Sequence, residues 1–210
     1  MIELFGSALV TFLVIIDPPG VVPIFASLTR DDPARRRRAT AIRASIVAWA
    51  ILMFFALLGK PMLHALGISL SSFRIAGGIL LFYIAIDMVF ERRTQRREGR
   101  AQSIEGTPEA DDISVFPIAI PMIAGPGSIA SAMLWVSRAE GIEQIATVLA
   151  AITVVIALTL ISLLAAAPIM KLLGPRIEVV ITRILGVILA ALAAQFIIDG
   201  LKQSFPHVLA

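Results

Sequence analysis

The sequence predicts an all-α integral membrane protein with six transmembrane helices in two inverted-topology three-helix repeats, the first and fourth helices being broken in mid-membrane. Three observations lead to this prediction. The 210 residues are 58% hydrophobic and only 16% charged, with a mean hydropathy of +0.92, which is far from the composition of soluble domains. Six long apolar runs divide the chain. A short helix-breaking motif occurs twice, once in the first run and once in the fourth.

The six apolar runs are each long enough to cross a bilayer, which needs about 20 mostly apolar residues in a helix. They cover residues 2–28, 39–59, 68–90, 113–136, 145–167 and 179–201. The first three form a predicted repeat at 1–90, and the last three form a second repeat at 113–210. Between them, the stretch 91–112 mixes both charges with Gly, Pro and Ser, so we expect a flexible cytoplasmic linker there.

The basic residues predict the orientation of these runs. The loops after the first, third and fifth runs are rich in arginine, and the other side of the membrane holds only Lys60, Arg74, Arg138 and Lys202 of the 18 Lys and Arg residues. Because basic loops stay in the cytoplasm, both termini are expected to lie outside. Each half has an odd number of spans, so the second half runs upside down relative to the first.

The repeated motif predicts where two helices break. Its two copies are Asp17-Pro18-Pro19-Gly20 and Ala124-Gly125-Pro126-Gly127, the second followed by Ser128. Proline donates no backbone hydrogen bond and disfavours helical geometry in the residue before it, so each run should unwind and restart as a second half-helix. Unwound backbone is tolerated in a membrane only where protein buries it or where it lines a cavity. Both breaks are therefore expected to face the bundle interior.

The two breaks together predict a substrate site. Two antiparallel half-helices would direct their N-termini, with unpaired amides and positive dipole ends, toward the midplane, which suits an anion. The Asp17 carboxylate would accept an ammonium group, or would couple movement to H+ or Na+, since an ionised Asp near mid-bilayer costs about 2.5–3.5 kcal/mol on insertion scales. The predicted substrate-binding residues are Asp17, Pro18, Pro19, Gly20, Gly125, Pro126, Gly127 and Ser128.

Structural roles are the alternatives for these and the other polar or small residues. Proline kinks and small residues are common in membrane helices, and Asp17 alone is a good N-cap. Asp87 and Asp199, near the ends of the third and sixth runs, are expected at the membrane interface. Gly77-Gly78 and Gly186, which match when the halves are aligned, are expected to let these two runs approach closely.

Composition excludes several classes of function. The chain has no cysteine and only two histidines, far apart in sequence, so we expect no metal and no cofactor. The pI near 9.9 reflects basic residues in short loops between apolar runs, and we expect no nucleic-acid partner. No nucleophile with its base, phosphate loop or pair of catalytic carboxylates is visible, so we expect that the protein is not an enzyme.

Around these motifs the chain resembles the MarC family of bacterial and archaeal inner-membrane proteins. The resemblance covers nearly the whole chain and is carried by residues 17–25, 74–81 and 117–129. It implies six spans, a multi-pass protein of the bacterial or archaeal inner (plasma) membrane, and a role related to the transport of small neutral amino acids. Some members of the family are reported to move glycine, alanine, serine or threonine.

The sequence and the resemblance together predict a secondary transporter of small neutral amino acids, with the substrate held between the two broken helices. One alternative is an exporter of other small metabolites or drugs. An alternative of another class is a non-transporting membrane scaffold or regulatory protein. The expected partners are the substrate, a coupling H+ or Na+ and the lipid bilayer, and faces of small residues also allow a homo-oligomer.

Overall fold

The computed structural model describes residues 1–92, 95–96, 99 and 112–205, and this part of the chain is helical throughout apart from short turns. Most of the predicted linker 91–112 lies outside the described residues. The elements in chain order are α1 (Ile2–Ile16), α2 (Pro18–Leu28), α3 (Ala34–Ala65), α4 (Leu70–Val89), η2 (Ser114–Ile123), α6 (Pro126–Arg138), α7 (Ile142–Leu164) and α8 (Ala166–Ser204).

The candidate membrane spans agree with the apolar runs of the sequence. Five stretches in the described part of the chain are long and apolar enough to cross a membrane: Ile2–Leu28, Ala34–Ala65, Leu70–Val89, Ile142–Leu164 and Val179–Ser204. The helices Ser114–Ile123 and Pro126–Arg138 form a bent pair, with 55° between them, that gives a sixth span if it is counted as one. The protein is therefore an all-helical, multi-pass membrane protein.

Two helices extend well beyond the apolar runs that predicted them. Helix α3 begins at Ala34 rather than near residue 39, because Arg35 to Arg38 are good helix formers and need no apolar surroundings. Helix α8 begins at Ala166 rather than near residue 179. Its early start is compatible with Pro168, which falls in the first turn, where backbone N–H groups have no intrahelical acceptor in any case.

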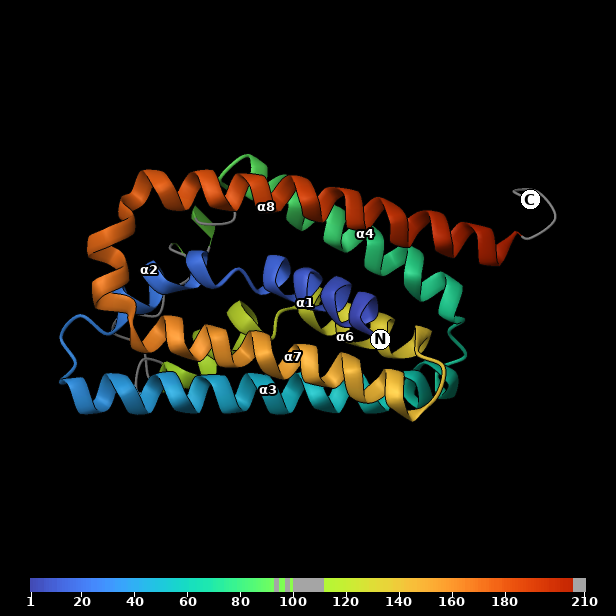
Figure 1. The fold of residues 1–210 in the computed structure, drawn as a ribbon, viewed down its shortest axis with the longest axis horizontal. Helices are drawn as coiled ribbons and strands as arrows, with labels where there is room; N and C mark the ends of the chain where they lie inside the picture. The colour runs from blue at the N-terminus through green and yellow to red at the C-terminus, as the bar shows by residue number, and fades with distance from the viewer. Residues whose placement is uncertain (93–94, 97–98, 100–111, 206–210) are drawn as a thin grey trace.

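The broken spans lie at the centre of the bundle (Figure 1). In the most apolar window of Ile2–Leu28, 72% of the residues are buried, against 28–39% in the other four long spans. Helices α3 and α7 pack together on one side, and α4 and α8 pack together on the other. Figure 1 also shows α1 and α2 following one another in one direction, while η2 and α6 run in the opposite direction.

Glycines bring α4 and α8 into close contact. A Cβ atom added at Gly78 would lie 2.6 Å from Ile197 Cγ1, and one added at Gly186 would lie 2.9 Å from Met88 Cβ, so neither position has room for a side chain. The expected contact between these two helices is thus confirmed for Gly78 and Gly186. Gly77 differs from the prediction, because it faces the side chain of Leu134 on α6 instead.

Candidate functional site

The first break is a single residue wide. Asp17 lies between α1 and α2 in the left-handed region (φ 57°, ψ 65°), a conformation that Asp tolerates better than most residues. Its N–H donates to the Leu13 carbonyl at 3.0 Å, and its Oδ1 accepts a hydrogen bond from the Gly20 N–H at 3.3 Å. The side chain is therefore the N-cap of α2. Only 1% of the surface of Asp17 is exposed, so the first break is enclosed by the surrounding protein.

The second break is wider and has no such cap. Helix η2 ends at Ile123 and α6 begins at Pro126, with Gly125 as an N-cap whose backbone is extended (φ −81°, ψ 171°) and which has no side chain to accept a hydrogen bond. The hydroxyl of Ser128 donates to the Ile123 carbonyl at 2.8 Å and ties the two helices together. A Cβ atom added at Gly125 would lie 2.5 Å from the Pro121 carbonyl oxygen, so only glycine fits there.

Helix η2 itself is irregular. Phe116 and Ile120 have extended backbone conformations inside it, and each precedes a proline in a cis peptide bond, Pro117 and Pro121 respectively. This helix therefore does not approach the break as a regular α-helix, and the Pro121 carbonyl oxygen lies against Gly125.

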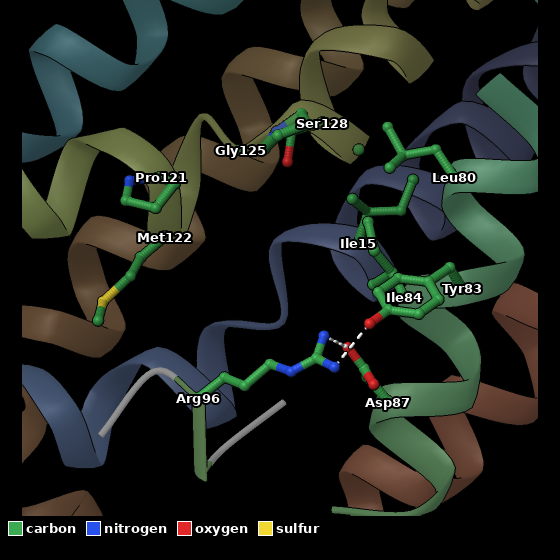
Figure 2. A pocket seen from close by; sticks show the side chains of 12 residues that line it. Ile15, Leu80, Tyr83, Ile84, Asp87, Arg96, Pro121, Met122, Gly125 and Ser128 are labelled. Atoms are coloured by element: carbon green, nitrogen blue, oxygen red, sulfur yellow. Dashed lines mark hydrogen bonds and ion pairs between the residues drawn. The ribbon is translucent and has the colours of Figure 1, made fainter. Parts of the chain in front are cut away.

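A cavity of about 330 Å³ lies against the second break (Figure 2). Its walls come from α1, α4, η2 and α6 and from Arg96, which follows α4. The residues that line it are Ile15, Leu80, Tyr83, Ile84, Asp87, Arg96, Pro121, Met122, Gly125, Pro126, Gly127 and Ser128. Most of these side chains are apolar. The polar groups gather at Ser128 and the start of α6 and at the cluster of Tyr83, Asp87 and Arg96.

The start of α6 gives the cavity a positive end. The amides of Gly127 and Ser128 belong to the first turn, where an α-helix leaves N–H groups without intrahelical acceptors and where its dipole is positive. The side chains of Ile84 and Ile15 pack closely against Gly127, because a Cβ atom added there would lie 2.6 Å from Ile84 Cδ1 and 3.5 Å from Ile15 Cγ2. This end of the cavity is suited to a small anionic group.

A three-residue cluster forms the other polar part of the cavity. The Asp87 side chain is only 8% exposed and forms an ion pair with Arg96, whose side chain is 53% exposed. Arg96 also donates from Nη2 to the Tyr83 hydroxyl at 2.6 Å, and its Cζ lies 5.2 Å from the centre of the Tyr83 ring. The dashed lines in Figure 2 mark these contacts. The hydrogen bond to Tyr83 and the charge of Asp87 raise the pKa of the Arg96 guanidinium, which stays protonated.

A similar cluster lies on the other half of the chain. Arg138, at the end of α6, forms an ion pair with Asp199 of α8 at 2.5 Å, and Gln195 donates to the same carboxylate at 2.7 Å. The Arg138 Cζ lies 4.5 Å from the centre of the Phe196 ring. The Asp199 side chain is 30% exposed, whereas that of Asp87 is buried in the cavity wall.

The predicted site residues separate into two groups. Gly125, Pro126, Gly127 and Ser128 all line the cavity. Asp17, Pro18 and Gly20 are buried and Pro19 is half-buried, and none of these four lines it. The first broken span contributes Ile15 of α1 instead, two residues before Asp17. The structure therefore does not bring the two breaks together in this cavity.

Sequence reasoning missed the polar cluster of the cavity. Asp87 was expected at the membrane interface, and Tyr83, four residues before it on the same face of α4, was not among the predicted site residues. The sequence does carry a signal for this cluster, because the Asp87 carboxylate lies inside an apolar run. Arg96 lies beyond the helix in the predicted linker, and only the folded chain shows that it reaches Asp87. Within the described residues, no group of three or more His, Cys, Asp or Glu side chains is placed to hold a metal ion.

Comparison with known proteins gives a consistent result. A family model described as "MarC family integral membrane protein" matches residues 2–205. A UPF0056 membrane protein of the archaeon Methanocaldococcus jannaschii is 38% identical, over 96% of this chain and 97% of its own length. The UPF0056 membrane proteins YhcE of Escherichia coli and YvbG of Bacillus subtilis are 36% and 35% identical, over 93% and 98% of this chain and 90% and 98% of their own lengths. No solved structure matches the chain.

Proposed function

The chain belongs to the MarC family of integral membrane proteins, and on that premise we propose that it is a secondary transporter of small neutral amino acids such as alanine, glycine, serine and threonine. The observation that carries this proposal is the cavity of about 330 Å³ at the second break, which joins a helix N-terminus without a side-chain cap to an apolar wall. Pockets for small ligands are typically of this kind, mostly apolar with a few converging polar groups.

The chemistry of the cavity supports an amino acid as the substrate. The carboxylate of the substrate would bind at the start of α6, where the amides of Gly127 and Ser128 and the helix dipole favour an anion. Its side chain would contact Ile15, Ile84 and Met122, which line the cavity. Broken membrane helices bind substrate carboxylates in this manner in several transporter folds.

The arrangement of the helices supports two inverted repeats, at 1–90 and 113–210. The broken span α1–α2 runs antiparallel to the broken span η2–α6, and α3 and α4 pack against their sequence counterparts α7 and α8. Alternating access would follow from movement of one repeat against the other. The positive-inside rule supports an orientation with both termini outside and the linker 91–112 in the cytoplasm.

In this proposal Asp17 acts on transport through the first break and not by contact with the substrate in the cavity. Its carboxylate accepts the Gly20 N–H, so binding of a proton or Na+ at this carboxylate would weaken the cap of α2 and change the position of that half-helix. Ile15, which lines the cavity, lies two residues before Asp17 and would respond to such a change.

The test is counterflow uptake of labelled alanine, glycine and threonine into proteoliposomes that contain the protein, beside empty liposomes. Specific uptake is expected, and Gly127→Val should abolish it, because the added methyl groups collide with Ile84 and occupy the cavity. Gly6→Val is the matched control, since nothing lies within 4 Å of an added Cβ at Gly6. If folded native protein takes up none of the three amino acids, this substrate class is excluded.

The same experiment separates the two alternatives. An exporter of other small metabolites or drugs would keep the sensitivity to Gly127→Val, but with a different set of solutes. A membrane scaffold or regulatory protein would show no solute flux, and Gly127→Val would change only its thermal stability.

A further inference from the structure

Besides its positive end, the cavity holds a buried carboxylate that is already bound by a cation of the protein. We propose that Asp87 binds the ammonium group of the substrate, and that Arg96 occupies this position in the empty cavity and is displaced when the substrate binds. This inference rests on the proposed function and names the residue that would recognise the second charge of an amino acid.

Burial explains why Asp87 needs a cation at all times. The carboxylate lies in a membrane-spanning helix and its side chain is only 8% exposed. An isolated charge in such surroundings is costly, so a buried carboxylate is paired or is neutralised. Arg96 provides the pairing charge in the empty cavity.

The two partners of this ion pair differ in how firmly they are held. Asp87 and Tyr83 are parts of α4, whose position is set by its close packing against α8. Arg96 lies beyond the end of that helix at Val89, and its side chain is 53% exposed. The carboxylate is therefore the fixed part of the cluster. The guanidinium is the exposed partner and can move into water when another cation takes its place at Asp87.

The contacts of Arg96 are ones that an ammonium group can reproduce. Arg96 donates hydrogen bonds to both Asp87 and the Tyr83 hydroxyl and lies over the Tyr83 ring. An ammonium group also has several N–H donors and is attracted to an aromatic face. Figure 2 shows Ser128 in the upper part of the view and Asp87 in the lower part, and both line the cavity, so it presents a helix N-terminus and a carboxylate to one ligand.

Competition between Arg96 and the substrate predicts the sign of a mutational effect. When only a fraction of the protein has a free site, the apparent affinity is lowered by that fraction. Removing the competing cation should therefore strengthen substrate binding. If Arg96 instead bound the substrate's carboxylate directly, its removal would weaken binding.

The experiment measures binding of alanine and of N-acetylalanine, which lacks the ammonium group, to purified full-length protein by calorimetry. We expect Arg96→Gln to tighten alanine binding by about tenfold. Arg92→Gln, which changes an exposed arginine outside the cavity, is the matched control and should leave binding unchanged. Weaker alanine binding by folded Arg96→Gln protein would overturn the proposal.

A double variant keeps the test decisive if Arg96→Gln protein does not fold with Asp87 unpaired. Asp87→Asn combined with Arg96→Gln removes both charges and leaves no ion in this cluster. The native protein should prefer alanine over N-acetylalanine, and the double variant should lose this preference. A preference retained by the double variant would show that another group binds the ammonium.

Uptake by the native protein separates this inference from the proposed function. If native protein transports alanine and the variants do not change the preference for the ammonium group, only the role of Asp87 is wrong. If native protein neither binds nor transports any of the amino acids tested, the proposed function fails, and the ammonium site at Asp87 fails with it.

Discussion

The two helix breaks have similar sequences but different structures. At the first break one residue, Asp17, separates two helices, and its own carboxylate caps the second of them. At the second break two residues, Ala124 and Gly125, separate the helices, and no side chain caps α6. The first break is enclosed by protein, whereas the second forms one end of the cavity.

This difference shows how a duplicated motif can acquire two roles. A helix N-terminus that is capped by its own side chain has already used the donors that a ligand would need. A helix N-terminus without a cap keeps them available. The carboxylate of Asp17 therefore gives the first break a structural role, and glycine at position 125 leaves the second break free to bind a ligand.

Among substitutions at the two breaks, Gly125→Ala is expected to cause the largest loss of stability. The added methyl group would lie 2.5 Å from the Pro121 carbonyl oxygen, a backbone atom that cannot move aside cheaply, so we expect a loss of about 1–3 kcal/mol of stability. Gly6→Ala, in open space inside α1, should instead be neutral or stabilising by about 0.5–1 kcal/mol. Thermal unfolding in detergent measures both. Equal stability of the two variants would contradict the tight geometry of the second break.

A smaller effect is expected when the cap of the first break is removed. Asp17→Ala should cost about 0.5–2 kcal/mol, because the buried Gly20 N–H loses its side-chain acceptor. Asp17→Asn keeps an acceptor and should be close to native in thermal unfolding. If Asp17 also couples transport to an ion, Asp17→Asn should abolish the dependence of uptake on a pH or Na+ gradient. Unchanged gradient dependence would leave Asp17 with the structural role alone.

The smallest effect on stability is expected from Ser128→Ala, which removes the hydrogen bond across the second break. The loss should be about 0.5–1.5 kcal/mol. Ser137→Ala, at the other end of α6, removes a similar hydrogen bond to the Leu134 carbonyl and should cost a similar amount. Only Ser128→Ala is expected to change amino acid uptake, because only Ser128 lines the cavity. Uptake that is equally reduced in both variants would indicate a general loss of stability.

The sequence predicted the local features of this fold more completely than its tertiary ones. The spans follow from hydropathy, and the breaks follow from Pro18, Pro19 and Pro126, because proline acts on the backbone of its own segment. Two similar motifs gave no indication of which break would open onto a cavity. That depends on one additional unwound residue at Gly125 and on the neighbouring helices. The contact between Arg96 and Asp87 joins a helix to a segment beyond its end, and no local pattern predicts it.

The glycine contacts between α4 and α8 have a consequence for substitutions in either helix. Gly78 meets Ile197, and Gly186 meets Met88. Each of the two helices therefore supplies a glycine that receives a side chain of the other. A side chain added at either glycine would push the helices apart, so a substitution in α4 and one in α8 would disturb the same contact.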